Sequence, residues 1–444
     1  MVNLNKSGPK PTVLDLFCGA GGLAAGFQDA GYRVVGGIDY AEAAVQTFRD
    51  NIVGAKGMVR DLRKGDFEDI ASFVDGEIDV IVGGPSCQGF STSGGLSKAA
   101  GRDLTDPRNR LFNNYIDIVD HLQPSWIVFE NVTGLLLYNN GKVALDIVQA
   151  FNEIGYDLAP MILLAADYGV PQLRRRLIFI GNRTGSAIPF PAPTHGNPTL
   201  WKNYSLPFAH LSRIGAGGVG ALPHVSFVDA CGDLPPVIEG GEVDGVPYSQ
   251  PASTEYQVEM RRRSTEVRQH AAADLSTLDR TAAQTLLPGQ NWTNLPKDVL
   301  PARFAKIRQY DATTLLKRLR DDFPAYTITT KFNEGTTGAF IHPTQARTIT
   351  LREAARLQSF PDHFVFAGSA AQIRQQIGNA VPPLLARCIA EAMLPTVMRD
   401  VYDVEMADLR DVVAVEIDRH EVDPLKLHGA RRKAKDQQAQ LELV

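Results

Sequence analysis

The sequence predicts an α/β fold with a mainly parallel sheet and a smaller, irregular domain inserted into it. Near the N-terminus an apolar stretch runs through a glycine-rich turn into a helical pattern, and this strand–helix alternation then recurs along the chain. The alternation stops near residue 182 and resumes near residue 347. Repeated strand–helix units are typical of parallel sheets whose strands share one carboxyl edge, and the interruption indicates a second domain.

Composition excludes several classes of protein. The 444 residues are 44% hydrophobic and 21% charged, as in ordinary globular proteins. No apolar run approaches the ~18 residues of a membrane span, and the N-terminus lacks an apolar signal region. The four cysteines are widely spaced without a CxxC pair, so we expect neither disulfides nor structural zinc, and a cytoplasmic protein. The net charge of −5 argues against non-specific coating of nucleic acid but permits a local basic face.

The first strand–turn–helix unit has the pattern of a nucleotide-binding fold. Residues 12–18 form the strand, Gly19 to Gly22 the turn, and residues 23–30 the helix. A second strand, 32–38, ends at Asp39, roughly twenty residues after the turn, a spacing typical of a carboxylate that binds ribose hydroxyls. The turn alone fits NAD, FAD or S-adenosylmethionine (SAM). The third glycine of the dinucleotide fingerprint is missing, which favours SAM.

The loop Gly83 to Ser91 presents one cysteine directly after the apolar strand 78–82. Its glycines and proline define a backbone path rather than a core contact. A cysteine is most often a small buried hydrophobe, and this is the alternative interpretation of Cys87. Loops after strand ends carry the chemistry of α/β enzymes, which makes Cys87 a candidate reactive group.

Three further positions belong to the same pattern of strand ends. Asp61 follows a third strand and precedes a helix at 67–73, so it is either a cap-region acid or an adenine contact. Glu130 ends the strand 126–129, after an amphipathic helix at 110–122. Four successive strands thus end in Asp39, Asp61, Cys87 and Glu130, and the sheet predicts that these groups share one edge.

A helix at 142–154 leads to Pro171–Arg176 and a strand at 177–180. Arg174 and Arg176 lie two residues apart, so a strand would place both on one face, where they could meet the same ligand as Glu130. A charged sheet edge is the alternative.

The middle of the chain is rich in proline and glycine, with basic and aromatic residues interleaved. These residues are Arg261, Arg262, Arg263, Trp292, Arg303, Lys306, Arg308, Tyr310, Lys317 and Arg318. They are interpreted either as solubility charge or as phosphate contacts. Beyond them, Thr350 and Glu353 form a capping-box pattern that opens a helix, and a last apolar helix covers 384–397. The charged residues after it predict a helix and a loose tail.

Taken in order, these motifs resemble those of the DNA (cytosine-5) methyltransferases of the bacterial, restriction–modification type. The matching segments are Asp-Leu-Phe-x-Gly-x-Gly-Gly at 15–22, Pro-x-Cys-Gln at 85–88, Glu-Asn-Val at 130–132, Gln-x-Arg-x-Arg at 172–176, Arg-x-x-Thr-x-Arg-Glu at 347–353 and Gly-Asn-x-Val-Pro at 378–382. They span 12–183 and 345–395. Ser86 departs from the family, which usually has proline there.

The resemblance implies a SAM-dependent, Rossmann-like catalytic domain at 1–183, a target-recognition domain at 184–345, completion of the catalytic domain at 346–400, and a charged helix or tail at 401–444. It implies SAM as methyl donor, with S-adenosylhomocysteine as product, and no metal. The expected partner is double-stranded DNA, without a membrane. The protein is expected to be a monomer, with a cognate restriction endonuclease as a genetic partner only.

The resemblance also implies catalytic roles. Cys87 adds to carbon 6 of cytosine, Glu130 protonates or hydrogen-bonds ring N3, Arg176 holds O2, and Arg174 supports the loop. The cytosine is flipped out of the duplex, helped by contacts from the middle domain and a mobile 88–101 loop. The implied SAM contacts are Phe17, Gly19, Ala20, Gly21, Gly22, Leu23, Asp39, Asp61, Pro85, Leu111, Asn379 and Val381. Because Asn379 is distant in sequence, the C-terminal helix must pack back against the first strand–helix unit.

Three rival functions are alternatives. A tRNA cytosine-5 methyltransferase shares these motifs but usually carries a Cys-Phe-Thr signature, which this sequence lacks. An inactive DNA-binding module would not need Cys87, Glu130 and Arg176 together. A NAD-linked oxidoreductase is disfavoured by the missing glycine and by the lack of an acid/base pair for hydride transfer.

Overall fold

The computed structural model describes residues 10–63, 67–74, 76–85, 110–137, 141–196, 221–308 and 312–398. They form two compact units. The described residues of the first lie within Met1–Met161, Leu177–Pro191 and Ala386–Ile417, and those of the second within Ile162–Arg176 and Ala192–Leu385. Cys87, the 88–101 loop and the predicted tail after residue 400 lie outside the described residues. The functional domain boundaries at 183, 345 and 400 stay a prediction.

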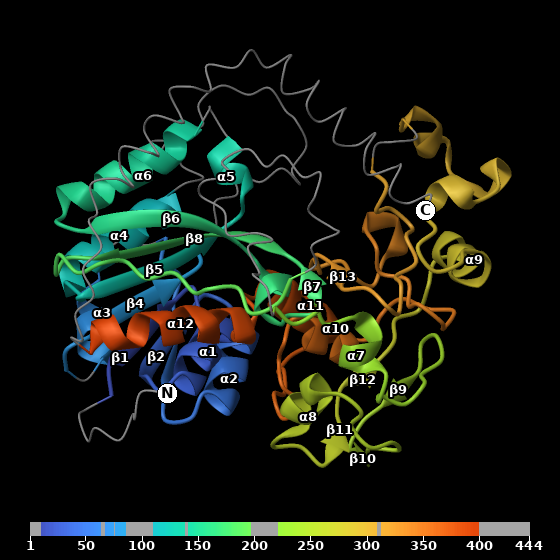
Figure 1. Cartoon of the computed structure of the whole chain (residues 1–444), viewed down its shortest axis with the longest axis horizontal. Coiled ribbons are helices and arrows are strands. Elements are labelled where there is room, and N and C mark those ends of the chain that lie inside the picture. Colours follow the sequence, from blue (N-terminus) through green and yellow to red (C-terminus); the bar gives the residue numbers. More distant parts are fainter. Residues whose placement is uncertain are drawn as a thin grey trace. The chain divides into compact units, whose positions relative to one another are not determined.

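A seven-stranded sheet in the order β3-β2-β1-β4-β5-β8-β6 forms the first unit's centre (Figure 1). The strands are β1 (Thr12–Leu16), β2 (Arg33–Asp39), β3 (Lys56–Val59), β4 (Val80–Gly83), β5 (Trp126–Asn131), β6 (Asp157–Leu164) and β8 (Arg175–Asn182). The pairs from β3 through β5 are parallel, and β8 is antiparallel to β5. The prediction of a mainly parallel α/β sheet is confirmed, and β6 is a strand that sequence reasoning missed.

Helices connect these strands. They are α1 (Gly22–Asp29), α2 (Glu42–Asn51), α3 (Glu68–Phe73), α4 (Arg110–Leu122), α5 (Gly134–Leu137), α6 (Lys142–Glu153) and α12 (Pro383–Val397). The Tyr32 hydroxyl, just after α1, donates a hydrogen bond of 3.2 Å to the Ala390 carbonyl on α12. This contact confirms that the C-terminal helix packs back against the first strand–helix unit.

An aromatic core fixes β5 against its neighbours. The Phe129 ring of β5 stacks on Phe179 of β8, with 4.3 Å between ring centroids, and on Phe151 of α6, at 5.6 Å. Phe112 of α4 meets Phe129 edge-on at 5.5 Å. All four rings are fully buried. Such contacts add to the hydrophobic burial itself and hold the end of β5, where Glu130 lies, in a defined place.

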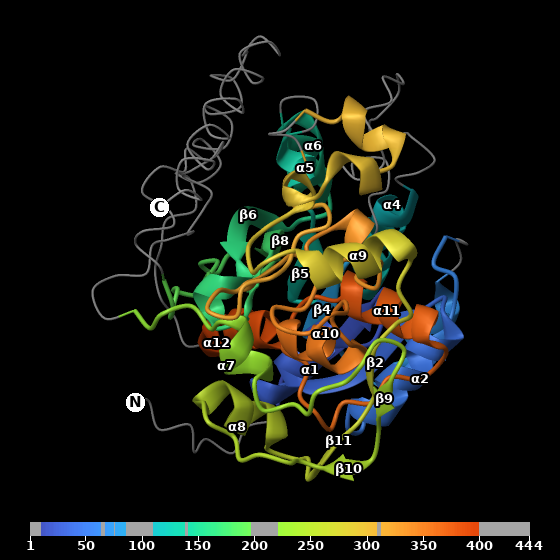
Figure 2. The same cartoon turned by 90° about the vertical axis from the view of Figure 1, so that its right-hand side faces the viewer.

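The second unit is built from short elements, as the irregular composition predicts. Its strands and helices are η5 (Ala165–Tyr168), β7 (Gln172–Leu173), α7 (Phe227–Cys231), β9 (Glu242–Val243), β10 (Val246–Pro247), α8 (Glu255–Arg261), β11 (Glu266–Val267), β12 (His270–Ala271), α9 (Thr277–Thr285), η7 (Trp292–Asn294), η8 (Lys297–Val299), η9 (Ala302–Lys306), β13 (Ala325–Tyr326), η10 (Gly335–Thr337), α10 (Leu351–Leu357) and α11 (Ala370–Asn379). Helix α10 packs among α7, α11 and β12 (Figure 2). Its predicted capping box of Thr350 and Glu353 is confirmed.

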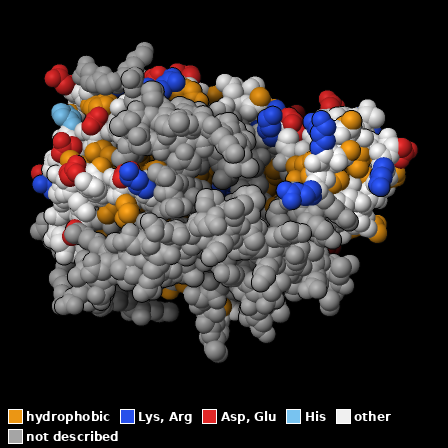
Figure 3. Space-filling model, turned by 90° about the horizontal axis from the view of Figure 1, so that it is seen from above, with side chains coloured by type: hydrophobic (Ala, Val, Ile, Leu, Met, Phe, Trp, Pro, Cys, Tyr) orange, Lys and Arg blue, Asp and Glu red, His pale blue; other side chains and the backbone are white. Residues whose placement is uncertain are grey.

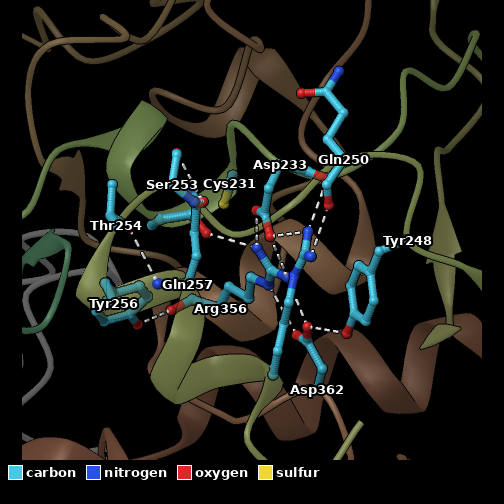
Figure 4. A network of polar contacts seen from close by, with 12 residues as sticks. Cys231, Asp233, Tyr248, Gln250, Ser253, Thr254, Tyr256, Gln257, Arg356 and Asp362 are labelled. Atoms are coloured by element: carbon cyan, nitrogen blue, oxygen red, sulfur yellow. Dashed lines mark hydrogen bonds and ion pairs between the residues drawn. The ribbon is translucent and has the colours of Figure 1, made fainter. Parts of the chain in front are cut away.

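Buried arginines before and on α10 organise this unit. Arg347 forms a two-pronged ion pair with Glu353, with N–O distances of 2.7 and 2.8 Å. Arg356 binds Asp233 and Asp362 together, and its Nε lies 2.8 Å from Asp362 (Figure 4). All five side chains are at most 2% exposed. The charges are compensated inside the protein, so this network, which we call the arginine hub, links α10 to chain segments more than a hundred residues away.

The basic and aromatic residues of the middle region were interpreted either as solubility charge or as phosphate contacts. This interpretation is wrong for Trp292, Lys317 and Arg318, which are buried. Arg318 donates to the carbonyls of His342 and Pro343 at 2.8 and 2.9 Å. Arg261 is largely buried and pairs with Asp233. These side chains hold backbone and carboxylates inside the unit, so they are neither solubility charge nor phosphate contacts. Tyr310 lies outside the described residues.

One stretch of the described residues, Ala370–Val397, has the length and apolar composition of a membrane span. It consists of α11 and α12, separated at Ala380–Pro382 by non-helical backbone. Apolar residues along α12 are fully buried, among them Leu385, Ile389 and Met393. Packing of this kind is that of a core helix, which passes the same test of length and hydropathy.

Candidate active site

The turn between β1 and α1 passes through left-handed backbone conformations. The φ angles are +57° at Phe17, +52° at Gly19 and +91° at Gly21. A Cβ on Gly21 would lie 2.9 Å from the Phe48 ring. Position 21 therefore requires glycine for two reasons, its left-handed backbone conformation and the lack of space for a side chain. A Cβ on Gly19 would meet nothing within 4 Å. The turn therefore has open space beside its backbone, as expected where a ligand approaches closely. Within the turn Ala20 is buried, and at the start of α1 so are Gly22 and Leu23.

Asp39 ends β2 and holds this turn. One carboxylate oxygen accepts the Gly19 N–H at 2.9 Å, and the other accepts the Ala41 N–H at 2.9 Å. Burial raises the pKa of Asp39, and these backbone hydrogen bonds oppose the rise. The next residue, Tyr40, is 61% exposed. Tyr40 was missed by sequence reasoning; an aromatic residue directly after the ribose-type carboxylate was the available signal.

Asp15 is a second carboxyl group at the turn, and sequence reasoning missed it as well. Its Oδ2 accepts the Ala24 N–H at 3.2 Å, and its Oδ1 is buried without a hydrogen-bond partner in the described residues. Burial, with a smaller contribution from Asp39, raises its pKa well above the usual value. A polar residue in the middle of the apolar strand Thr12–Leu16 was the signal for it.

Asp61 follows β3 and does not cap α3. Its carboxylate pairs with Arg63 at 2.7 Å. The neighbouring Leu62 carbonyl accepts a hydrogen bond from the buried Asn114 side chain on α4. Leu111, one turn earlier on α4, is half-buried. This part of the expected SAM site is thus tied to α4 through Leu62.

Glu130 and Asn131 lie at the end of β5, beside the start of the Cys87 loop. The Asn131 amide donates to the Pro85 carbonyl at 3.3 Å. A Cβ on Gly84 would lie 3.6 Å from Glu130 Oε2. The structure thus brings the carboxyl group of Glu130 next to a residue three positions before Cys87. The parallel strands place this end, the glycine turn and Asp39 on the same edge of the sheet, as predicted.

Arg174 and Arg176 differ in their surroundings. Arg174 is 1% exposed, and its guanidinium donates to the carbonyls of Ile328 at 3.0 Å, Gly378 at 3.2 Å and Ala380 at 2.9 Å. Arg176 is half-buried and donates to the Arg175 carbonyl at 2.7 Å. On β8, Arg176 precedes Leu177, whose partner on β5 is Asn131.

Asn379 and Val381, the C-terminal residues expected to contact SAM, belong to the second unit. Arg174 binds the carbonyls on both sides of Asn379 and fixes this backbone segment. A Cβ on Gly378 would lie 2.4 Å from the Thr330 backbone nitrogen, so only glycine fits there. Val381 is buried, whereas Asn379 is exposed. The side-chain amide of Asn379 is thus presented on a backbone held by buried contacts.

The chain is similar to known proteins over most of its length. A family model described as C-5 cytosine-specific DNA methylase matches residues 11–395. Type II methyltransferase M1.HphI of Haemophilus parahaemolyticus is 32% identical over 384 residues, covering 86% of each chain. Type II methyltransferase M.AgeI of Thalassovita gelatinovora is 32% identical over 431 residues, covering 86% of this chain and 98% of the relative.

A solved structure has the same fold. It is an E. coli protein described as a DNA modification methyltransferase encoded within a prophage, with a TM-score of 0.62 at 23% identity. The match covers 86% of this chain and 98% of that one. The family model spans most of the sequence, and both relatives are more than 30% identical over most of their length. This chain belongs to the C-5 cytosine-specific DNA methylase family and is a DNA (cytosine-5-)-methyltransferase.

Proposed function

We propose that the protein methylates carbon 5 of a flipped-out cytosine in a specific duplex DNA sequence, through a covalent bond between Cys87 and carbon 6. The supporting observation is the position of Glu130, whose carboxylate lies beside Gly84 at the start of the Cys87 loop. Asn131 holds the Pro85 carbonyl in the same place. A nucleophile and an acid from neighbouring strand ends are the pair that this reaction needs.

The residues of the first unit fit SAM. The turn at Gly19 has open space, Asp39 retains acceptor capacity for ribose hydroxyls, and exposed Tyr40 offers a face for the adenine ring. The buried, unpartnered Oδ1 of Asp15 is a further acceptor beneath the turn. Phe17, Asp61, Pro85, Leu111, Asn379 and Val381 complete the proposed contacts. Bound SAM supplies an electrophilic methyl group on sulfur.

The chemistry explains the need for these residue types. Carbon 5 of cytosine is a weak nucleophile because the ring is aromatic and electron-poor. Addition of the Cys87 thiolate to carbon 6, with a proton from Glu130 to N3, turns carbon 5 into an enamine carbon that takes the methyl group. Arg176 stabilises the charge at O2. Loss of the carbon-5 proton to a base then drives β-elimination, which breaks the sulfur–carbon bond and restores the thiolate, and the N3 proton returns to Glu130.

The proposed roles of the two arginines are distinct. Arg174 binds only backbone carbonyls in the hydrogen bonds described above, so we assign it a positioning role for the segment that carries Asn379. Arg176, which is half-buried, is the arginine that we assign to the cytosine. Extrusion of the base costs about a few kcal/mol, which contacts from the recognition domain offset.

The named relatives are type II methyltransferases. We therefore propose that this protein acts in a restriction–modification system with a cognate endonuclease as genetic partner. We also propose that it acts in the cytoplasm and as a monomer. The test for that context is the neighbouring gene: an endonuclease whose cleavage is blocked by this modification supports it, and host DNA left cleavable argues against it.

The reaction is tested by expression in a host that lacks cytosine methylation, followed by bisulfite sequencing. We expect 5-methylcytosine at one sequence context. Cys87→Ser should abolish it while SAM and DNA binding remain measurable, and Cys388→Ser, a half-buried cysteine on α12, should keep it. Substantial turnover by Cys87→Ser would contradict the covalent route, and methylation confined to tRNA would contradict the DNA substrate.

A further inference from the structure

The segment Asn291–Arg308 forms a small, rigid platform in the second unit, drawn in gold in Figure 1. It consists of η7, η8 and η9, which follow one another along the chain. Trp292 and Phe304 anchor it, with 5.4 Å between ring centroids, and the Trp292 indole donates to the Ala312 carbonyl at 3.2 Å. They join a core of Leu275, Ala282, Ala283, Leu286, Leu295, Leu316 and Ile341. Because the aromatic anchors point inward, the charged side chains are left outside.

The outward face of this platform is basic. Lys297, Arg303, Lys306 and Arg308 are exposed, and Asp298 is the single acid among them, which leaves a net charge of +3 (four basic minus one acidic). The whole chain carries −5. Figure 3 shows Lys and Arg side chains gathered at the right-hand end of the face in view. Positive charge is therefore concentrated locally in an acidic protein.

The basic side chains of the platform also differ from six arginines elsewhere that are paired with acids. Among the described residues, Lys297, Arg303 and Lys306 have no carboxylate within ion-pair distance. Six other arginines each pair with an acid: Arg49 with Glu42, Arg63 with Asp61, Arg268 with Glu266, Arg280 with Glu239, Arg320 with Asp322 and Arg387 with Glu391. Solubility charge is usually interspersed with acids, whereas clustered, uncompensated charge is typical of an anion-binding surface.

The backbone presents these charges in a fixed arrangement. Pro296 and Pro301 stand at the N-caps of η8 and η9, and the turns close by backbone hydrogen bonds of 2.9 to 3.3 Å. In a 3₁₀ helix residues three apart share a face, so Arg303 and Lys306 project together. A preformed surface loses less conformational entropy when it binds.

We propose that Lys297, Arg303 and Lys306 form a contact surface for the phosphate backbone of duplex DNA. The inference rests on the proposed function only for its choice of duplex DNA as the polyanion. Contacts to phosphate position a protein on the duplex and carry no sequence information. The platform therefore raises affinity for all duplexes alike, and recognition of the target sequence belongs to other residues.

The test is the salt dependence of binding to a short random-sequence duplex, which requires no knowledge of the target. The full-length triple variant Lys297→Gln, Arg303→Gln, Lys306→Gln should weaken binding. Each lost phosphate contact removes about 0.9 from the slope of log K against log salt, so the slope should fall by up to about 2.7 between about 50 and 200 mM salt. Each single variant should remove about 0.9.

A matched control removes the same charge elsewhere, by Arg49→Gln, Arg268→Gln and Arg387→Gln at arginines that are already paired. It should leave the slope unchanged. An unchanged slope in the platform variants, or an equal fall in the control, would overturn the proposal. Far-UV circular dichroism checks folding, and the single variants decide if the triple variant fails to fold. Binding to random duplex does not depend on Cys87, so failure of the proposed chemistry would leave this result standing.

Discussion

The carboxyl groups of the glycine turn and those of the arginine hub have opposite electrostatics. In the first unit, burial raises the pKa of Asp15 and Asp39, which receive only backbone N–H groups in their described hydrogen bonds. In the second unit, burial alone would raise the pKa of Glu353 and Asp362 too. Instead, Arg347 and His342 lower the pKa of Glu353 well below its usual value, and Arg356 lowers the pKa of Asp362.

The difference separates a scaffold from a site. In the arginine hub every buried charge meets an opposite charge, so the network holds its segments in one arrangement. At the glycine turn the carboxyl groups keep acceptor capacity that the described residues do not use, and one oxygen of Asp15 has no described partner. Uncompensated polar groups cost stability, and their position at the predicted SAM site supports the proposal that a ligand binds there.

The largest expected effect comes from breaking the hub. Arg356→Met leaves Asp233 and Asp362 buried without their shared cation, which should lower the free energy of unfolding by about 3–5 kcal/mol. Urea denaturation measures this loss. Arg387→Gln, which removes a half-buried arginine paired with the exposed Glu391, is the control and should cost at most about 0.5 kcal/mol. Equal losses in the two variants would contradict a scaffold role for the hub.

A smaller effect is expected at the site. Asp39→Asn keeps the side-chain shape but removes the charge and one acceptor oxygen. A hydrogen bond to a charged group contributes about 1.5–3 kcal/mol, so the KM for SAM should rise by roughly 10- to 100-fold, with kcat much less affected. Steady-state methylation kinetics at varied SAM measure the split. A fall in kcat at unchanged KM would contradict a role in cofactor binding.

The smallest effect on stability is expected at Asp15. The sign of its pH dependence distinguishes the glycine turn from the arginine hub. The folded-state pKa of Asp15 is raised, so stability is greatest below the unfolded pKa of about 3.9 and falls as pH rises through the folded value. Asp15→Asn should therefore be as stable as the parent chain, or more stable, near neutral pH.

Glu353→Gln is the opposite case. The lowered folded-state pKa of Glu353 stabilises the protein above about pH 4.3, and this stability is lost as pH falls through the folded value. The variant should be destabilised near neutral pH and have a shallower acid limb. Denaturation midpoints measured across pH for both variants test the signs, and shifts of the same sign would remove the distinction between the two regions.

Much of the first unit could be predicted from the sequence, because apolar strands followed by glycine or polar residues have a strong local pattern. The strand ends at Asp39 and Glu130 lie on one edge as expected. The antiparallel partner of β5 could not be predicted, since strand direction depends on a connection rather than on local residues.

The second unit was less predictable because its stability depends on distant pairs. Arg356 and Asp233 are 123 residues apart, and no local pattern shows that such an arginine is buried. Arg318 likewise looks like surface charge until its carbonyl partners are known. Asp15 was missed for the converse reason: its strand was recognised as apolar, and the carboxyl group within it was assigned no role of its own.

The central claim is the covalent role of Cys87, and trapping tests it most directly. In a duplex with 5-fluorocytosine at the methylated position, carbon 5 carries fluorine in place of the proton that a base must remove before β-elimination. The enzyme should therefore remain covalently attached to the base in the presence of SAM. Peptide mapping should place the adduct on Cys87, and Cys87→Ser should form none. Absence of a stable adduct, or an adduct on another residue, would contradict the account.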